Sequence, residues 1–347
     1  MSKRASGSLT IVDVAEHAGV SIKTVSRVLN HEAGVHESTR ELVLRSVKEL
    51  KYRPKLSARS LAGSRSFLIG LFYYSNSAAY VAPIQQGAVS RCREIGYHLV
   101  VESLEAEGRG LEEQVEHVIG ALRVDGVILT PPLCDNARIR KALHETGTPV
   151  VLISPGKSGG IPSVMMDDEH ASMELTNLLL DMGHRRIGFI KGAASQVAST
   201  LRYRGFEQAL RARGLAVDPQ LVRQGEFTFG SGQQCADELL ALAVPPTAIF
   251  ASNDDMAIGV LASAHSRRLS VPADLSVVGF DDSPLAKLVW PALTTVRQPL
   301  FEMATAAVDL LLAAARLGEP GTAKVVPQVL AHDLVVRGSM APPKTLA

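Results

Sequence analysis

The stretch T-I-V-D-V-A-E-H-A-G-V-S-I-K-T-V-S-R-V-L-N, residues 10–30, decides how the N-terminal part of the chain folds. Thr10 can cap a first helix, with Asp13 three residues further on as an acidic variant of the capping box. Gly19 follows the last apolar residue of that helix and suits the left-handed backbone that ends many helices. Ser21 can cap a second helix over Ile22 to Leu29. Two short helices joined by a glycine-containing turn predict a helix-turn-helix.

The second of these helices has two different faces. Val25, Val28 and Leu29 form an apolar stripe, and Lys23, Ser26 and Arg27 lie on the polar side. A polar and basic helix face suits the major groove of DNA, whereas an ordinary helical hairpin is the competing interpretation. A third helix, expected over about residues 37–51, completes a small domain with one shared core.

The distribution of charge favours the DNA-binding interpretation. The 347 residues carry a net charge of only +1, from 36 Lys and Arg against 35 Asp and Glu. Residues 1–66 hold 12 of these basic residues and 6 of the acidic ones, which leaves 24 basic against 29 acidic in the remainder. A basic head on a mildly acidic body is the electrostatic pattern of a DNA-binding module joined to another domain.

The remaining composition indicates a cytoplasmic globular protein. Cys92, Cys134 and Cys235 are far apart and lack the spacing of a zinc or redox motif, so we expect free thiols, no metal site and no cofactor. The N-terminus has no apolar signal segment, and no apolar run approaches the roughly 20 residues that span a bilayer. We therefore expect a cytoplasmic, nucleoid-associated protein that does not contact the membrane.

A linker follows the head. Pro54 ends the preceding segment and can open a short helix over Leu56 to Ala62, with Gly63 as its end. A helix this short is marginal in water, so the segment is either a disordered linker or a hinge that folds on DNA. Arg59 could then contact phosphates, and Leu61 could wedge between base steps in the minor groove.

From residue 67 onward, short apolar runs alternate with helical patterns. The expected strands are 67–73, 98–103, 126–130, 149–154, 186–191, 248–252 and 275–280, and the expected helices are about 82–95, 111–122, 136–146, 170–182, 200–213, 231–243 and 254–267. Continuous Val, Ile and Leu runs are typical of parallel strands buried on both faces. Two successive series predict two doubly wound α/β subdomains. The tail, with 293–298, a helix about 300–316 and strands near 324–336, crosses back between them.

These residues resemble the LacI/GalR family of bacterial transcription regulators. The motifs that carry the resemblance are the 10–30 stretch, T-R-x-x-V at 39–43, Y-R-P at 52–54, A-R-S-L at 58–61, G-H-R-R-I-G-F-I at 183–190, R-x-x-G-F at 202–206, F-A-S-N-D-x-M-A-I-G at 250–259, S-V-V-G-F-D-D at 276–282 and P-x-L-T-T-V at 291–296. The resemblance implies a repressor that binds a pseudo-palindromic double-stranded DNA operator as a homodimer. It also implies a periplasmic-binding-protein-like core that binds a small effector.

The resemblance implies three segments and a set of DNA contacts. The segments are a helix-turn-helix domain at 1–54, a hinge at 55–66 and a core at 67–340, whose N-subdomain is about 67–166 plus 295–325 and whose C-subdomain is about 167–294 plus 326–340. Arg27 and Lys23 are the natural readers of guanine, and Ile22 could touch a thymine methyl. The full set of expected DNA-binding residues is Thr10, Ser21, Ile22, Lys23, Thr24, Ser26, Arg27, Asn30, Tyr52, Ala58, Arg59 and Leu61.

Candidate effector contacts follow the strands, because ligands of parallel sheets lie beyond the carboxyl ends of the strands. They are Tyr73, Tyr74, Asn76, Asp167, Arg202, Phe227, Asn253, Asp281 and Gln298. Asp168 is an alternative to Asp167, and either tyrosine could pack instead of binding. For Asp254 and Asp282 we favour helix capping or interdomain bonds. Carboxylates, amides, one arginine and aromatic rings suit a polyol, so we expect a sugar or sugar derivative as effector.

Other functions are less well supported by the residues. A purine- or nucleoside-responsive co-repressed regulator of the same family is the main alternative for the effector. An enzyme is disfavoured, because no G-x-G-x-x-G follows a strand and neither a Walker A motif nor a Ser/His/Asp elbow is present. An exported sugar receptor would not carry residues 1–66. The C-terminal R-G-S-M-A-P-P-K-T-L-A has two prolines and no heptads, so we expect a dimer rather than a tetramer.

Overall fold

The computed structural model describes residues 9–29, 34–52, 65–74, 77–104, 111–317 and 326–344. The predictions for Asn30, Ala58, Arg59, Leu61, Asn76 and the hinge helix lie outside the described residues. The contacts divide the chain into two compact units, residues 1–67 and 68–347. In the described part of the chain, no helix combines the length and the apolar character needed to cross a bilayer.

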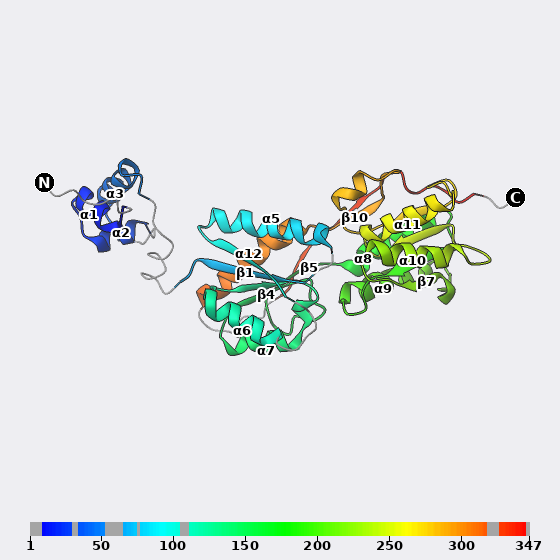
Figure 1. Ribbon diagram of the computed structural model, residues 1–347, viewed down its shortest axis with the longest axis horizontal. Helices are drawn as coiled ribbons and strands as arrows, with labels where there is room; N and C mark the ends of the chain where they lie inside the picture. Colours follow the sequence, from blue (N-terminus) through cyan, green and yellow to red (C-terminus); the bar gives the residue numbers. More distant parts are fainter. Residues whose placement is uncertain are drawn as a thin grey trace. The chain divides into compact units, whose positions relative to one another are not determined.

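The first unit is a three-helix head made of α1 (Ile11–Ala18), α2 (Ile22–Leu29) and α3 (Glu37–Glu49) (Figure 1). The backbone N–H and the hydroxyl of Thr10 both donate to Oδ2 of Asp13, at 2.7 and 2.8 Å, which fixes the start of α1. Gly19 has a φ of 64° and ends that helix, as predicted. Val14, Val25 and other buried apolar residues of the three helices form one core.

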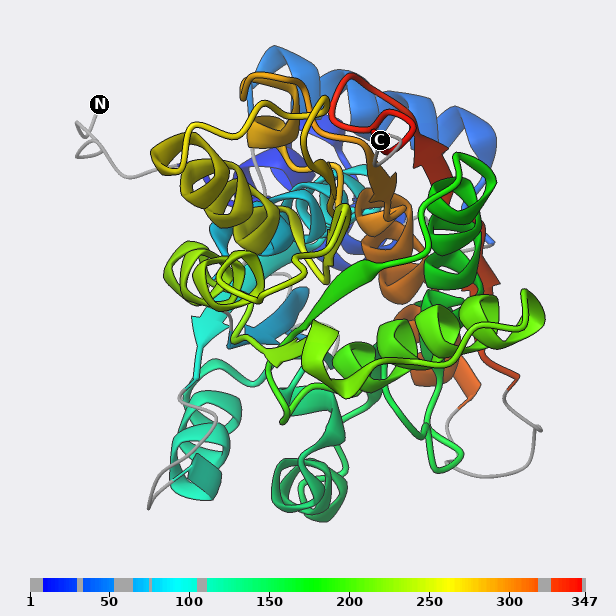
Figure 2. The same cartoon turned by 90° about the vertical axis from the view of Figure 1, so that its right-hand side faces the viewer.

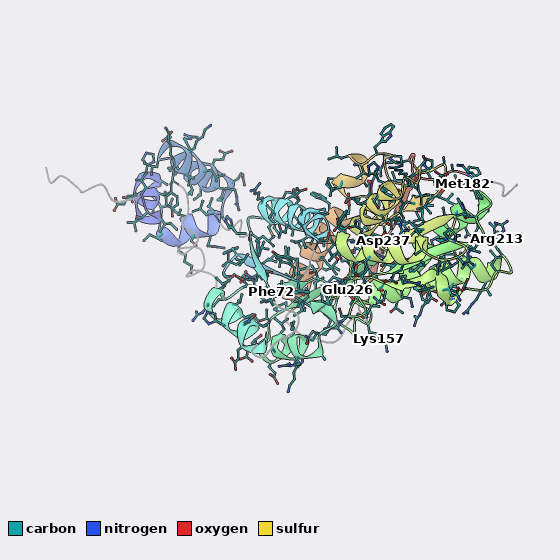
Figure 3. The ribbon with its side chains drawn as sticks, turned by 45° about the vertical axis from the view of Figure 1, so that its right-hand side comes forward. Phe72, Lys157, Met182, Arg213, Glu226 and Asp237 are labelled. Atoms are coloured by element: carbon teal, nitrogen blue, oxygen red, sulfur yellow. The ribbon has the colours of Figure 1, made fainter. Side chains whose placement is uncertain are left out.

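The first lobe of the second unit is a parallel sheet with strand order β11-β5-β4-β3-β1-β2. Its elements are β1 (Leu68–Tyr73), α5 (Ala78–Glu94), β2 (His98–Ser103), α6 (Leu111–Leu122), β3 (Val127–Leu129), η1 (Leu133–Asp135), α7 (Ala137–Glu145), β4 (Val150–Ile153), β5 (Ser163–Met166), α12 (Leu300–Leu317) and β11 (Gln328–Leu330). Figure 1 shows α5 and α12 on one face of the sheet, with α6 and α7 on the other. Phe72, near the carboxyl end of β1, is fully buried and is labelled in Figure 3. The inner strands β1, β3 and β4 are buried on both faces, which explains their continuous apolar runs, whereas the edge strands β2 and β11 are partly exposed.

The second lobe is built around a smaller parallel sheet with strand order β7-β6-β8-β9. Its elements are α8 (Asp168–Asp181), β6 (Ile187–Lys191), α9 (Val197–Ala212), η2 (Pro219–Leu221), β7 (Val222–Gln224), α10 (Phe229–Leu240), β8 (Ala248–Ala251), α11 (Asp254–Ser266), β9 (Ser276–Val278), η3 (Pro284–Lys287), β10 (Thr295–Arg297) and β12 (Asp333–Val335). In Figure 2 the α8–α9 pair and the α10–α11 pair lie on different sides of the strands. Phe189 packs in the core on the α8–α9 side, and the next residue, Ile190, packs on the other.

The chain passes between the lobes three times, and two of the expected subdomain boundaries differ from this path. β11 pairs in parallel with β5, so Gln328–Leu330 belongs to the first lobe, whereas the boundaries expected from the sequence assign 326–340 to the second. β10 pairs in antiparallel fashion with β12, and Val296 packs in the second lobe's core, so 295–297 belongs to the second lobe and not to the first. Both differences arise from long-range strand pairing, which local patterns do not encode. The passages accordingly lie near residues 167, 298 and 331.

Candidate functional site

The four candidate DNA readers on α2 differ in their exposure. Ile22 is 48% exposed and Lys23 is exposed, whereas Ser26 and Arg27 are half-buried. All four stand on the helix that the sequence predicts as the DNA reader. Their individual DNA contacts remain predictions.

Three other residues of the expected DNA-binding set have structural roles within the head. The Ser21 hydroxyl accepts from the backbone N–H of Thr24 at 3.1 Å and lies 2.9 Å from the Thr24 hydroxyl, so this pair shapes the start of α2. Tyr52 is 7% exposed and packs in the core of the head, where burial raises the pKa of its phenol. The structure thus gives Tyr52 a packing role, and its expected DNA contact stays a prediction.

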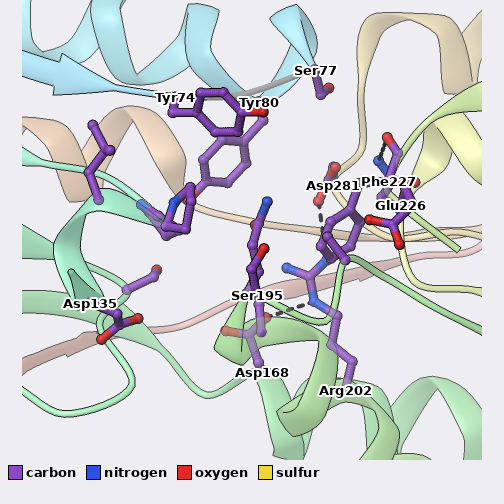
Figure 4. A pocket seen from close by; sticks show the side chains of 18 of the residues that line it. Tyr74, Ser77, Tyr80, Asp135, Asp168, Ser195, Arg202, Glu226, Phe227 and Asp281 are labelled. Carbon is purple, nitrogen blue, oxygen red and sulfur yellow. Dashed lines mark hydrogen bonds and ion pairs between the residues drawn. The ribbon is translucent and has the colours of Figure 1, made fainter. Parts of the chain in front are cut away.

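A cavity of about 650 Å³ lies between the two lobes of the second unit. It is lined by Tyr74, Ser77, Tyr80, Pro131, Pro132, Leu133, Asp135, Asn136, Ser154, Asp168, Ala193, Ser195, Gln196, Ala198, Arg202, Glu226, Phe227, Asn253, Asp281 and Gln298. We call this cavity the cleft pocket. Figure 4 shows that Tyr74 and Tyr80 approach it from the first lobe, opposite Arg202, Phe227 and Asp281 of the second. The side chains thus converge from both lobes.

Arg202, on α9, organises the charges of the cleft pocket. Its Nε donates to Oδ1 of Asp168 at 2.8 Å, and its Nη1 donates to the carbonyl of Ser252 at 2.6 Å. The same Nη1 lies 3.8 Å from Oδ1 of Asp281. The guanidinium carbon lies 3.7 Å from the centroid of the Phe280 ring, and Arg202 as a whole is 4% exposed. The guanidinium is therefore held in place before a ligand arrives, which reduces the ordering cost of binding.

Asp281 also accepts a hydrogen bond from Gln298. Nε2 of Gln298, at a passage between the lobes, donates to Oδ1 of Asp281 at 2.6 Å. Burial raises the pKa of the Asp281 carboxyl above its usual range, although the positive charge of Arg202 opposes this shift. The carboxyl thus sits where a ligand hydroxyl could donate to it.

Phe227 and Asn253 form the aromatic and amide side of the cleft pocket. Asn253 caps α11 by accepting from the backbone N–H of Met256 at 3.0 Å, and its Nδ2 donates to the carbonyl of Phe227 at 3.1 Å. Phe227 itself has a φ of 58°, in the left-handed region of the backbone. The hydrogen bond from Asn253 helps to hold it in this conformation. A Cβ on Gly192 would lie 1.9 Å from Cζ of Phe227, so the ring packs directly against the backbone at Gly192.

Two neighbouring carboxyls, Asp254 and Asp282, do not line the cleft pocket. They bond within the second lobe, whereas the sequence favours helix capping or interdomain bonds for them. Asp254 accepts from the Thr295 hydroxyl and from the backbone N–H of Ser283, both at 2.7 Å, and burial raises its pKa. Asp282 accepts from Nε of Arg297 at 2.7 Å and also pairs with Arg337. These bonds fix the loop that carries Asp281.

The cleft pocket brings together six of the nine expected effector residues: Tyr74, Arg202, Phe227, Asn253, Asp281 and Gln298. Tyr73 and Asp167 are not among its lining residues. Asp167 instead caps α8 by accepting from the backbone N–H of His170 at 2.9 Å, and the next residue, Asp168, faces the cavity. The choice of Asp167 over Asp168 therefore disagrees with the geometry, because the first turn of α8 rotates the second carboxylate inward.

Two groups of residues that line the cleft pocket were not predicted from the sequence. The first group follows β3, β4 and β6, and the second lies in the first turn of α5. The lining residues Pro131, Pro132, Leu133, Asp135, Asn136, Ser154, Ala193, Ser195 and Gln196 all lie beyond the carboxyl ends of parallel strands. The same strand-end rule that pointed to Asn253 and Asp281 would have found them. Tyr80 carried no such signal, because its position depends on where α5 begins. Burial raises the pKa of the Tyr80 phenol.

Family comparisons agree with this architecture. Residues 10–55 match the family described as bacterial regulatory proteins, lacI family, and residues 176–340 match a periplasmic binding protein-like domain. Catabolite control protein A of Priestia megaterium is 33% identical over 306 residues, which cover 88% of this chain and 92% of that protein.

Two solved structures extend the similarity over nearly the whole chain. The transcriptional regulator CelR in complex with cellobiose has a TM-score of 0.73 at 32% identity, covering 95% of this chain and 99% of that one. The Lac repressor dimer bound to operator and the anti-inducer ONPF has a TM-score of 0.79 at 31% identity, covering 96% and 100%.

A helix-turn-helix head followed by a two-lobed core with a cleft pocket defines a ligand-responsive DNA-binding regulator. The chain belongs to the lacI family of bacterial regulatory proteins, as its sequence motifs predicted. It is a transcriptional regulator and not an enzyme.

Proposed function

We propose that the chain is a repressor whose affinity for a pseudo-palindromic operator is controlled by a carbohydrate bound in the cleft pocket. The observation that carries this proposal is the fixed Arg202 guanidinium between the carboxylates of Asp168 and Asp281. A cavity of about 650 Å³ is also within the size range of small-molecule sites.

The chemistry of the cleft pocket supports a polyol ligand. A sugar hydroxyl both donates and accepts hydrogen bonds. Asp168 and Asp281 can accept from it, Arg202 can donate to it, and the amides of Asn253 and Gln298 can do either. The rings of Phe227 and Tyr74 can cover the apolar face of a pyranose. The related CelR structure contains cellobiose.

The position of the cleft pocket supports control of DNA binding. Its walls come from both lobes, and Asp168 and Gln298 lie at two of the three passages between them. A ligand that contacts both lobes binds one lobe arrangement more tightly than another and so shifts their equilibrium. That shift is the physical requirement for an effector.

We also propose that the protein acts as a homodimer in the cytoplasm. Leu288 and Trp290 are 78% and 93% exposed and are two residues apart in the second lobe. Contiguous exposed apolar patches mark interaction surfaces, and we propose that these two residues belong to one. The related Lac repressor structure is of a dimer bound to operator. A two-fold dimer places two heads on two half-sites, which matches a pseudo-palindromic operator.

Selection of DNA from a random library tests the DNA-binding half of the proposal. The full-length protein should enrich a pseudo-palindrome, and the Arg27→Ala variant should lose that preference while keeping salt-sensitive binding to DNA of any sequence. Enrichment of the same sequence by both proteins would contradict the assignment of Arg27 as a base reader. Failure of the wild-type protein to enrich any sequence would contradict operator recognition.

A thermal-shift screen of monosaccharides, disaccharides and nucleosides tests the effector half. A carbohydrate that binds the folded protein should raise the melting temperature. The shift should disappear in Asp281→Asn and persist in Asp333→Asn, a matched change at an exposed carboxylate of the second lobe. A nucleoside shift with no carbohydrate shift would overturn the carbohydrate assignment in favour of the nucleoside alternative.

A further inference from the structure

A second cluster of ligand-type side chains lies outside the cleft pocket. It consists of His170 and Glu174 on α8 and His332 between β11 and β12. One ligand atom from each of the three side chains lies within 4.8 Å of the other two. Neither operator binding nor the cleft pocket uses these residues.

The geometry of the cluster is close to that of a bound metal ion. Nε2 of His332 lies 2.7 Å from Oε2 of Glu174, and Nδ1 of His170 lies 3.8 Å from the same oxygen. Ligand atoms on a tetrahedral Zn²⁺ with bonds of about 2.0–2.1 Å are about 3.3 Å apart. The two separations from Glu174 bracket this value, and the ligand atoms of the two histidines lie within 4.8 Å of each other. Side-chain rotations that bring the two imidazoles together would place all three ligand atoms around one ion.

The fold holds the three residues together. His170 and Glu174 are four residues apart on one helix, which places both side chains on the same face. The start of α8 is fixed, since Asp167 caps it at the backbone N–H of His170. His332 comes from the third passage between the lobes, and its ring lies edge-on to that of His170 with centroids 5.8 Å apart.

The surroundings favour a divalent transition metal that enters from solvent. The side chain of His332 is 10% exposed, whereas those of His170 and Glu174 are 49% and 40% exposed, so an ion can reach the cluster. Two imidazoles and one carboxylate suit Zn²⁺, Co²⁺, Ni²⁺ or Fe²⁺. Mg²⁺ and Ca²⁺ prefer oxygen ligands throughout and provide negative controls.

We propose that His170, Glu174 and His332 bind one divalent first-row transition metal ion, which ties the passage between β11 and β12 to the first turns of α8. The ion replaces the direct His332–Glu174 hydrogen bond with bonds from all three side chains to one centre. Water completes its coordination. Because α8 belongs to the second lobe and the passage leads into the first, the ion restrains a connection between the lobes.

Cobalt titration of the full-length protein, purified without a polyhistidine tag, tests the proposal. One equivalent of Co²⁺ should produce visible ligand-field absorption bands of a site with low coordination number, and Zn²⁺ but not Mg²⁺ should displace them. His170→Ala and His332→Ala should each weaken Co²⁺ binding at least about 100-fold, because even partners in the outer shell contribute about 10- to 100-fold to metal affinity. The control His265→Ala, an exposed histidine on α11, should bind like the wild type.

The alternative is a hydrogen bond between His332 and Glu174 with no metal site, and it predicts a different outcome of the titration. If His332 and Glu174 form only a hydrogen bond, the wild-type protein shows no bands, and Zn²⁺ leaves its melting temperature unchanged. Bands that persist in the doubly substituted protein His170→Ala/His332→Ala would place the metal elsewhere and also overturn the proposal. Glu174→Gln keeps the side-chain shape, so bands lost in this variant, with circular dichroism unchanged, would support ligation by the carboxylate.

Discussion

Nε of Arg202 donates to Oδ1 of Asp168 at 2.8 Å, and both side chains are only 5% exposed. Asp168 is the first residue of α8, directly after the chain has passed from the first lobe, and Arg202 lies on α9 of the second lobe. This ion pair connects α8 and α9 of the second lobe, and both of its side chains line the cleft pocket. Ligand binding and stability of the core should therefore depend on the same residues.

Removal of Arg202 should destabilise the core. The Arg202→Met variant leaves Asp168 buried without its cation, and breaking such a buried pair costs about 3–5 kcal/mol. Urea denaturation should show this loss in the free energy of unfolding. The double variant Asp168→Asn/Arg202→Met should recover part of it, because the buried charge is gone. A loss below about 1 kcal/mol in Arg202→Met would mean that the pair contributes little.

Effector affinity should rise with pH. Burial raises the pKa of Asp281, so in the ligand-free protein this carboxyl stays protonated to a higher pH than an ordinary aspartate. A ligand hydroxyl that donates to Asp281 favours its ionised form, so binding releases a proton. Affinity must then increase as pH rises through the raised pKa and level off above it. Calorimetric titrations across this range, in buffers of different ionisation enthalpy, measure both the affinity and the released proton.

The Asp281→Asn variant is the control for this pH dependence. It should bind the effector weakly and with no proton release through this group. A pH profile identical to that of the wild type would assign the proton to another residue.

Gly192→Ala should weaken effector binding through Phe227. The added Cβ would meet Cζ of Phe227 at 1.9 Å, so the ring has to leave its place in the cleft pocket. We expect about a tenfold loss of effector affinity, equivalent to about 1.4 kcal/mol, in isothermal titration. Gly230→Ala is the matched control, because a Cβ on Gly230 meets nothing within 4 Å. Equal affinities in both variants would remove Phe227 from the ligand contacts.

Trp290→Asp should convert the protein from a dimer to a monomer. Trp290 is 93% exposed and lies two residues after Leu288. An interface hot spot, a class enriched in Trp, contributes about 2 kcal/mol or more, about 30-fold or more in the dissociation constant. Sedimentation velocity over a concentration series measures the dissociation constant. Val244→Asp, at another exposed apolar residue of the second lobe, should remain dimeric. A wild-type protein that is monomeric throughout would contradict the proposed dimer.

The sequence predicted the parts of the fold that local patterns encode. The caps at Thr10 and Ser21 and the glycine turn at Gly19 are in place, and continuous runs such as A-I-F-A became buried parallel strands. Two strands were missed. β7 reads V-R-Q, which is short and mostly polar, and β5 reads S-V-M-M, in which only one residue is of the β-branched or aromatic type that favours strands.

Some site residues could not be predicted because their positions depend on helix rotation and on long-range strand pairing. Asp167 and Asp168 are adjacent, and only the rotation of α8 decides which one caps the helix and which one faces the cleft pocket. The passage of β11 into the first sheet depends on pairing with β5, more than 150 residues earlier in the chain. His332 follows β11 directly, so the cluster of His170, Glu174 and His332 also depends on this pairing. It was not predicted from the sequence. Contacts of this kind appear only once the chain is folded.

The measurement that tests the central claim most directly is the affinity of the full-length protein for its selected operator, with and without a saturating carbohydrate from the screen. Fluorescence anisotropy should show that the carbohydrate changes the operator dissociation constant by about 5- to 150-fold, with the same factor for the effect of operator on carbohydrate affinity. Asp281→Asn should bind the operator normally but lose the response. An operator affinity that is the same with and without bound carbohydrate would contradict the account.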